Sequence, residues 1–242
     1  MERRLSGKVA IVTGASRGVG RAISVTLAKE EATVVLAARS PQKLAETAEE
    51  VREAGGKAEI VITDLTREEA IKNLMKVTND KFSRLDILVN NAGVTVSAEL
   101  EQTSTRDWDR LFAVNARAPF ILCREALPLL RKAPNAYIIN IVSVVGVKCY
   151  ALQSAYTASK HALRGMTKSL AEELRDTNVR VHSICPGGID TDMISAIRPD
   201  IKKEDLMRPE EIAELVLYLI THKGNAVIDE LHIRRAASAP WF

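Results

Sequence analysis

The sequence predicts a doubly wound α/β fold, in which helices cover both faces of a parallel sheet. Short apolar runs alternate along the chain with longer segments whose apolar residues recur at helical spacing. The runs are apolar at almost every position, which is typical of strands buried on both faces. A strand–helix alternation with right-handed crossovers produces this architecture.

The elements follow one another from the N-terminus with few interruptions. Pro41 suits the first turn of a helix, and Gly55-Gly56 ends that helix. We expect strands at Lys8–Thr13, Thr33–Ala38, Ala58–Thr63, Ile87–Val89, Ala136–Val142, Val179–Cys185 and Ala226–Ile233. We expect helices at Arg21–Glu30, Pro41–Ala54, Glu68–Phe82, Asp107–Leu130, Ala155–Arg175 and Glu210–Thr221. We expect an irregular charged loop at Asp190–Met207 and a tail, Ala236–Phe242, that is loose or reaches a neighbouring subunit.

Length and composition favour one domain over residues 1–242. A chain of 242 residues with 46% hydrophobic content can build a single core. The formal charge of +3 is small and its cations are spread among acids, so we expect no nucleic-acid partner. No run approaches the ~20 apolar residues of a membrane helix, and the polar N-terminal residues lack an apolar region, so we expect neither a membrane span nor a signal peptide.

Cysteine and histidine patterns predict a reduced protein without a metal. Cys123, Cys149 and Cys185 are odd in number and widely spaced, so we expect free thiols and a cytoplasmic location. The four histidines are scattered and none has a ligand spacing such as His-x-x-x-His. We therefore expect no metal site.

A glycine-rich turn follows the first predicted strand and opens the first helix. Gly14, Gly18 and Gly20 permit a tight turn, close approach of backbone to a pyrophosphate, and close helix–strand packing. The helix N-terminus offers free N–H groups and a positive dipole end to phosphate. A plain strand–helix turn is the alternative, but the position after the first buried strand favours a dinucleotide site.

The end of the second strand indicates which dinucleotide binds. NAD-binding chains usually place an acid there to accept from the ribose hydroxyl. The stretch Leu36–Ser40 has no acid, whereas Arg39 can pair with a 2′-phosphate and Arg17 can add a second cation. We therefore predict NADP over NAD; two solvated surface arginines are the alternative.

Tyr156 and Lys160 are four residues apart, so they lie on one face of a predicted helix. A nearby fixed positive charge stabilises a phenolate and lowers the phenol pKa from its usual value of about 10. The pair therefore predicts a tyrosine acid/base that works near neutral pH.

The pieces together resemble the short-chain dehydrogenases/reductases over nearly the whole chain, which implies a Rossmann-type sheet. The matching pieces are Thr13-Gly14-x-x-x-Gly18-x-Gly20, Asp64, Asn90-Asn91-Ala92-Gly93, Asn115, Ser143, Tyr156-x-x-x-Lys160 and Pro186-Gly187-Gly188-Ile189-Asp190-Thr191. Each piece alone is modest, but their order and spacing are specific.

The resemblance implies a catalytic tetrad of Asn115, Ser143, Tyr156 and Lys160. Tyr156 would exchange a proton with the substrate oxygen, which Ser143 would position. Lys160 would bind the nicotinamide ribose and lower the tyrosine pKa, and Asn115 would anchor a relay water. The implied cofactor contacts, besides Tyr156 and Lys160, are Gly14, Ser16, Arg17, Gly18, Val19, Gly20, Asp64, Leu65, Asn91, Ala92, Gly93, Ile189 and Thr191. It also implies a homodimer or homotetramer that packs the helices Asp107–Leu130 and Ala155–Arg175 against their mates.

Pro119 lies four residues after Asn115 and has no N–H, so the Asn115 carbonyl lacks its helical partner. That oxygen is free to accept from the relay water. A kink made only for packing is the alternative.

The predicted function is NADPH-dependent reduction of a small-molecule ketone or aldehyde. The alternatives are an NAD(P)-dependent alcohol or polyol dehydrogenase working in oxidation, and a non-catalytic nucleotide-sensing or scaffold protein. We expect Val144, Val145, Cys149 and Tyr150 to line an apolar substrate pocket and Met193–Met207 to form its lid. The last strand lacks the glycine-rich ending often seen in the fatty-acid-synthesis reductases of the family.

Overall fold

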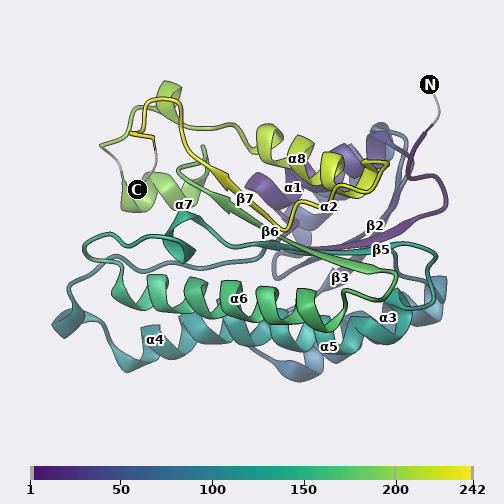
Figure 1. The fold of residues 1–242 in the computed structure, drawn as a ribbon, viewed down its shortest axis with the longest axis horizontal. Coiled ribbons are helices and arrows are strands. Elements are labelled where there is room, and N and C mark those ends of the chain that lie inside the picture. The colour runs from purple at the N-terminus through teal and green to yellow at the C-terminus, as the bar shows by residue number, and fades with distance from the viewer. Residues whose placement is uncertain (1–2, 199, 241–242) are drawn as a thin grey trace.

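The computed structural model describes residues 3–198 and 200–240, which form a seven-stranded parallel sheet between two layers of helices (Figure 1). The strand order is β3-β2-β1-β4-β5-β6-β7. The strands are β1 (Val9–Thr13), β2 (Thr33–Ala38), β3 (Lys57–Ile62), β4 (Ile87–Asn90), β5 (Ala136–Ile141), β6 (Val179–Pro186) and β7 (Glu230–Ile233). Every pairing is parallel, so the predicted doubly wound fold is confirmed.

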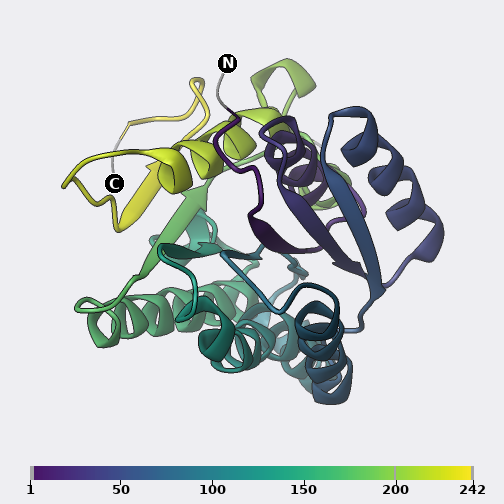
Figure 2. The ribbon, with the colours of Figure 1, turned by 90° about the vertical axis from the view of Figure 1, so that its right-hand side faces the viewer.

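Helices cover both faces of this sheet, as Figure 2 shows. One layer contains α1 (Gly18–Lys29), α2 (Pro41–Glu53) and α8 (Pro209–Thr221). The other contains α3 (Glu68–Phe82), α4 (Thr105–Phe112), α5 (Ala118–Leu130) and α6 (Ser154–Glu173). Each layer buries its own cluster of apolar side chains against the sheet, which is why β1 and β4 are buried along their whole length.

The strand order reverses at β1, which pairs with β2 on one side and β4 on the other. The loops after β1 and β4 therefore leave the sheet in opposite directions and open a crevice at its carboxyl edge. Open α/β sheets bind ligands at this point. The glycine-rich turn follows β1 directly, so the fold places it in the crevice.

The long helix predicted at Asp107–Leu130 is interrupted. A π-helical turn, η2 (Ala113–Arg117), separates α4 from α5. Pro119 follows this turn and cannot donate a hydrogen bond four residues back. Widening the helix by one residue is a common accommodation, and such π turns are frequent at functional sites.

The structure differs from two further expectations near the C-terminus. The predicted irregular loop Asp190–Met207 contains a short helix, α7 (Asp192–Ile197), and a 3-10 turn, η4 (Lys203–Asp205). The last strand begins at Glu230 rather than Ala226. Just before β7, the Ile228 carbonyl lies 2.7 Å from Nδ1 of His182, and the Asp229 carbonyl accepts from the Ser183 N–H at 2.9 Å.

The described part of the tail folds back on Arg234, whose Nη1 donates to the carbonyls of Arg235, Ala236 and Ser238. The rest of the predicted loose tail, residues 241–242, lies outside the described residues. Among residues 3–198 and 200–240, no helix combines the length and the apolar character needed to cross a bilayer.

Candidate active site

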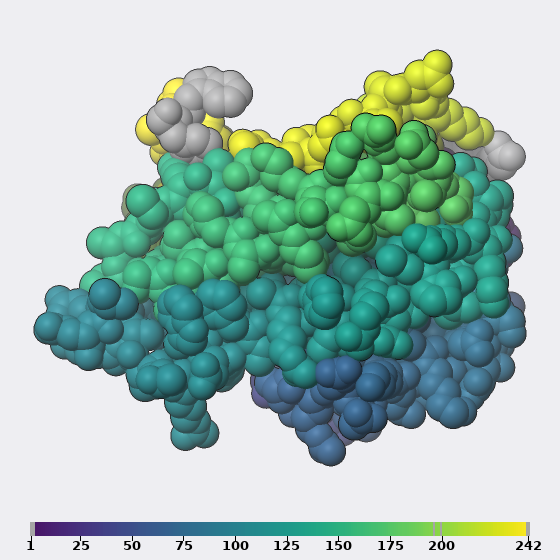
Figure 3. All heavy atoms as spheres, turned by 60° about the horizontal axis from the view of Figure 1, so that its bottom comes forward, coloured from purple at the N-terminus to yellow at the C-terminus, as the bar shows by residue number. Residues whose placement is uncertain are grey.

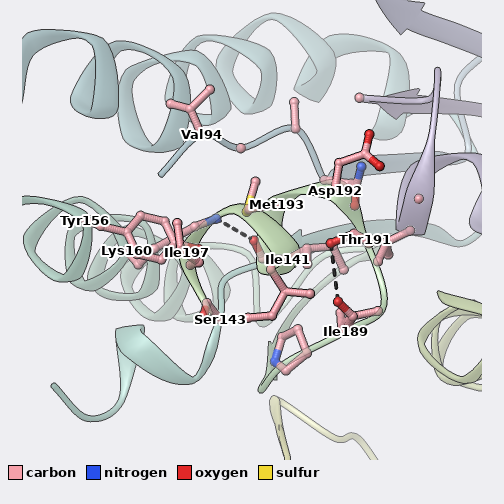
Figure 4. Close-up of a pocket in the computed structure, with 18 of the residues that line it drawn as sticks. Val94, Ile141, Ser143, Tyr156, Lys160, Ile189, Thr191, Asp192, Met193 and Ile197 are labelled. Atoms are coloured by element: carbon pink, nitrogen blue, oxygen red, sulfur yellow. Dashed lines mark hydrogen bonds between the residues drawn. The ribbon is translucent and has the colours of Figure 1, made fainter. Parts of the chain in front are cut away.

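A cleft of about 1430 Å³ runs along the carboxyl edge of the sheet, from the end of β2 to the segment after β7. This volume exceeds the roughly 300–1,000 Å³ of a pocket that holds one small ligand. The cleft therefore has room for a dinucleotide and a second molecule. Figure 4 shows its inner part, where Ser143, Tyr156 and Lys160 face α7.

The glycine turn between β1 and α1 is a cradle that side chains would fill. Gly14 and Gly18 have φ of +66° and +51°, in the region that favours glycine. A Cβ on Gly14 would lie 2.9 Å from Nδ2 of Asn91, and one on Gly20 only 2.3 Å from the Gly14 carbonyl oxygen. With Ser16, Arg17 and Val19 also lining the cleft, the turn fits the backbone approach that a pyrophosphate requires.

The segment after β4 is fastened to the end of β1. Oγ1 of Thr13 accepts from the backbone N–H groups of Asn91 (3.0 Å) and Ala92 (3.1 Å). Nδ2 of Asn91 donates to the Thr13 carbonyl at 2.8 Å, so this amide is used to build the site. Asn91, Ala92 and Gly93 all line the cleft beside the glycine turn. Thr13 thus helps to build the site, a role that was not predicted from the sequence.

The far end of the cleft, after β2 and β3, collects the residues predicted to hold adenosine and its 2′-phosphate. Arg39, Asp64 and Leu65 line it together. Arg39 is exposed, and no carboxylate of the described residues lies within ion-pair distance of it. Asp64 accepts from the N–H (3.0 Å) and hydroxyl (2.8 Å) of Thr66, and these bonds hold the pKa of its carboxyl below the usual value.

Two residues at this end were missed from the sequence, Ser40 and Lys43. Ser40 caps the N-terminus of α2 by accepting from the Lys43 N–H at 3.5 Å. A second cation and a helix N-terminus therefore lie beside Arg39, an arrangement suited to an anion. The signal was present in Pro41, which marks the start of the helix and puts Lys43 in its first turn.

Arg17, also predicted to approach the 2′-phosphate, has a partner in the structure. Its Nη1 lies 2.6 Å from Oδ2 of Asp192, the first residue of α7. Both side chains are largely exposed. This ion pair joins the glycine turn to α7 across the mouth of the cleft.

Asn115 lies within the π turn and is completely buried. Its Oδ1 accepts from the Val94 N–H at 2.9 Å, and its Nδ2 donates to the Val94 carbonyl (2.9 Å) and to Oγ of Ser159 (3.0 Å). The Ser159 hydroxyl donates in turn to the Tyr156 carbonyl at 2.7 Å. The side chain of Asn115 thus ties the loop after β4 to α6 at Ser159, the residue before Lys160. Ser159 in this link was missed from the sequence.

Ser143 follows β5 with a backbone conformation of φ +141° and ψ 158°. This region is almost restricted to glycine, so a serine there is strained by about 1–3 kcal/mol. The surrounding packing maintains that strain and turns the hydroxyl toward the cleft, where Ser143 and Tyr156 both lie. The Val145 N–H donates to Oγ at 3.3 Å.

Lys160 is 3% exposed, and its Nζ donates to the Ile141 carbonyl at 3.0 Å (Figure 4). Burial lowers the pKa of Lys160 from its usual 10.5 to about 8. The ammonium is therefore the major form at pH 7.

Tyr156 is also buried, and burial raises its pKa to about 12, opposed by its interaction with the Ser143 side chain. In the protein without cofactor the shift is therefore upward, opposite to the lowering by Lys160 that was predicted from the sequence. Removal of both groups from water is the larger effect. At neutral pH the phenol of Tyr156 is a proton donor.

The wall opposite Tyr156 comes from the segment after β6. Ile189 and Thr191 line the cleft, and Oγ1 of Thr191 donates to the Ile189 carbonyl at 3.3 Å. Figure 4 shows Met193 of α7 between this segment and Lys160, and Ile197 of α7 close to Tyr156 and Lys160. Val144, Val145 and Tyr150 line the same space as predicted. Cys149 is exposed and is not among the residues that line the cleft, so its predicted place in the pocket is wrong.

Cys185, Glu230 and His232 bring possible metal-ligand atoms within 4.8 Å of one another. Both carboxylate oxygens of Glu230, however, accept from Arg164 at 2.7 Å. A guanidinium that already occupies the carboxylate argues against a cation at this place.

The sequence matches the family model described as short chain dehydrogenase over residues 8–202. An uncharacterized oxidoreductase of Staphylococcus aureus strain N315 is 35% identical over 230 residues, which is 95% of this chain and 98% of that protein. The 3-oxoacyl-[acyl-carrier-protein] reductase of Thermotoga maritima is 34% identical over 236 residues, covering 94% of this chain and 96% of its own.

Solved structures agree in fold along the whole chain. A metagenomic short-chain oxidoreductase in complex with NADP has a TM-score of 0.85 and 39% identity, covering 96% of this chain and 99% of its own. An alcohol dehydrogenase from Thermococcus sibiricus complexed with 5-hydroxy-NADP has a TM-score of 0.89 and 27% identity, covering 97% and 99%.

Proposed function

The chain belongs to the short-chain dehydrogenase family, and on that premise we propose that it is an NADPH-dependent carbonyl reductase in which Tyr156 is the general acid. Membership makes it an NAD(P)-dependent oxidoreductase. The proposal adds the direction of reaction, the preferred cofactor and the roles of the residues.

The residues that would hold the cofactor are those of the glycine cradle, the adenosine end and the segment 189–191. The nicotinamide, when bound, supplies the hydride for the substrate carbon. The chain itself supplies placement and charge. Gly14, Gly18 and Gly20 let backbone N–H groups approach the phosphates, and Ile189 and Thr191 line the opposite wall.

Tyr156 would deliver the proton that reduction of a carbonyl to an alcohol also requires. Its raised pKa keeps the phenol protonated at neutral pH, which is the form that donates. The Ser143 hydroxyl would hold the substrate oxygen beside it. Lys160 would stabilise the phenolate left after transfer, since its ammonium lies one helical turn from Tyr156. Asn115 would act by positioning, through Ser159 and the loop at Val94.

NADPH is favoured over NADH by the charge at the end of β2. Arg39 has no described carboxylate partner and lies with Lys43 beside the N-terminus of α2. No acid stands at the end of β2 to accept from an unphosphorylated ribose. The two solved relatives described above hold NADP or an NADP derivative.

The same site working as an alcohol dehydrogenase is the second candidate, since the Thermococcus sibiricus relative is described as one. Oxidation requires the phenolate as base, and the raised pKa of Tyr156 disfavours that form. The same tyrosine is the acid in reduction and the base in oxidation, so the net direction follows the substrate and the ratio of reduced to oxidised cofactor.

The observation that carries the proposal is a buried, protonated phenol beside a strained serine in the same cleft as a glycine cradle. A panel of ketones, aldehydes, quinones and alcohols tests it by the absorbance of reduced nicotinamide. We expect NADPH consumption with at least one carbonyl class. Turnover of alcohols with NADP⁺ but of no carbonyl compound would refute the proposed direction.

We also propose a homodimer or homotetramer in the cytoplasm. Figure 3 shows the face formed by α4, α5 and α6, and on these helices Trp108 and Phe120 are 41% and 50% exposed. Exposed aromatic side chains on neighbouring helices favour an interface. Mass measurement in solution tests assembly, and deletion of residues 236–242 tests the tail. The free thiols of Cys123 and Cys185 support a reducing compartment.

A further inference from the structure

The substrate end of the cleft combines an apolar interior with a basic rim. Val94, Met193 and Ile197 contribute the apolar interior near Tyr156 (Figure 4), and Val145 packs in one apolar cluster with Tyr156 and Val94. The surrounding cations come from separate elements of the chain. They are Arg106, Arg110, Lys148, Arg198, Lys203 and Arg235, beside Arg234, whose guanidinium is bound to carbonyls of the tail. This pattern was not expected from the sequence, which spreads the six over about 130 positions.

The acids that line the same part of the cleft neutralise only part of this rim. They are Asp107, Asp190 and Asp192. Asp190 lies 3.3 Å from Nζ of Lys203, and Asp192 is paired with Arg17 of the glycine turn. Asp107 is hydrogen-bonded to Ser104 at 2.7 Å. A net positive charge therefore remains at the substrate end.

Arg110 gives one wall of the opening its charge. It lies one helical turn after Arg106 on α4, so both side chains share the face that lines the cleft. Both are exposed, and neither has a carboxylate within ion-pair distance among the described residues. In Figure 1, α4 lies below the sheet, whereas α7 and the chain after β7 lie above it at the same end.

Arg235 gives the opposite wall its charge, and a glycine makes the space for it. A Cβ placed on Gly188 would lie 3.2 Å from Cδ and 3.5 Å from Nε of Arg235. The arginine stem therefore lies over the segment between β6 and Ile189, next to the wall of the cleft. Its charge acts on Asp200, whose two oxygens are already bound by Arg198 at 2.7 Å. Arg198 holds the pKa of Asp200 below its usual value, and the charge of Arg235 acts in the same direction.

We propose that the substrate carries an anionic group, a carboxylate or a phosphate, at a distance from its reacting carbonyl, and that Arg110 and Arg235 recognise it. This inference rests on the proposed carbonyl reductase function. An apolar body would fill the space between Val94 and Ile197, and the anionic end would lie at the rim. Guanidinium groups suit both anions because they donate in a bidentate geometry.

The test compares aryl ketones that bear a carboxylate with their methyl esters, and with the corresponding phosphate monoesters. We expect a higher kcat/KM for the acids than for the esters, and a preference that weakens with added salt. Arg110→Gln and Arg235→Gln should each lower the acid-to-ester ratio roughly 10-fold, mainly through KM. Arg131→Gln, at an exposed arginine outside the cleft, is the matched control and should leave the ratio unchanged. Whether carboxylates or phosphates show the larger effect identifies the anion.

A binding measurement keeps the two proposals separable. Calorimetry with 4-phenylbutyrate, which has no carbonyl to reduce, should show weaker binding to Arg235→Gln than to the Arg131→Gln control. Equal turnover of acids and esters, together with equal binding of 4-phenylbutyrate by Arg235→Gln and Arg131→Gln, would overturn the proposal of an anionic substrate. The proposed reductase function would still stand. If no carbonyl compound is reduced, the reductase function fails, and the calorimetry alone decides whether the rim binds anions.

Discussion

Replacing Lys160 with methionine removes the buried charge and keeps a similar side-chain length. The fall of the Lys160 pKa from 10.5 to about 8 corresponds to roughly 3 kcal/mol against the charged form in the folded protein. Between these two values the unfolded chain binds more protons than the folded chain, so this unfavourable contribution fades as pH rises. At pH 10 it has fallen to below about 1 kcal/mol.

The substitution also leaves the Ile141 carbonyl without the 3.0 Å hydrogen bond from Nζ, which costs about 1–3 kcal/mol at any pH. The two effects together predict a variant equal to or up to about 2 kcal/mol more stable than the wild type at pH 7. At pH 10 the same variant should be less stable than the wild type by up to about 2 kcal/mol.

Urea unfolding of both proteins at the two pH values measures this difference, and other titrating groups cancel in the comparison. Lys168→Met, at an exposed lysine of the same helix, is the control and should show no such pH dependence. A stability difference between Lys160→Met and wild type that is the same at pH 7 and pH 10 would refute the buried ammonium on which the site depends.

Three further substitutions test the cofactor end of the cleft. Arg39→Asp should shift preference from NADP toward NAD, because a carboxylate accepts from a ribose hydroxyl and repels a 2′-phosphate; an unchanged ratio of kcat/KM for the two cofactors would reject the assignment. Asp192→Asn should tighten NADPH binding about 2–5-fold in a fluorescence titration, because it releases Arg17 from an exposed ion pair; weaker binding would show that the pair organises the site. Gly20→Ala should lower the free energy of unfolding by about 1–3 kcal/mol, because the added Cβ would lie 2.3 Å from the Gly14 carbonyl oxygen. The same substitution should weaken NADPH binding at least about 10-fold. Normal NADPH binding by this variant would contradict the role of the glycine turn in holding the cofactor.

Local sequence patterns predicted most elements of the fold. The strand Thr33–Ala38 and the helix Glu68–Phe82 were predicted with the bounds that the structure has, because a fully apolar run and a regular helical spacing leave little choice. The start of β7 was missed; just before it, the Ile228 carbonyl contacts the His182 ring, which is distant in sequence. Contacts of that kind leave no mark in the local pattern. The single-domain organisation of residues 1–242 stays a prediction.

The candidate site was predictable in its residue types and less so in its electrostatics. The cleft brings Ser143, Tyr156 and Lys160 together as the resemblance implied, but the direction of the tyrosine pKa depends on burial, which spacing does not report. The unusual backbone of Ser143 and the pairing of Arg17 with Asp192 also arise only from tertiary contacts. Pro119 did signal a disturbed helix, and the π turn before it is the form that the disturbance takes.

The most direct test of the account separates proton transfer from cofactor binding in Tyr156→Phe. The substitution removes one buried hydroxyl and leaves the glycine cradle and Lys160 in place. We expect kcat for a ketone accepted by the wild type to fall by about 10²–10⁴-fold, while the Kd for NADPH changes by less than about 3-fold. Undiminished turnover by a variant that binds NADPH normally would contradict the central claim that this phenol supplies the proton.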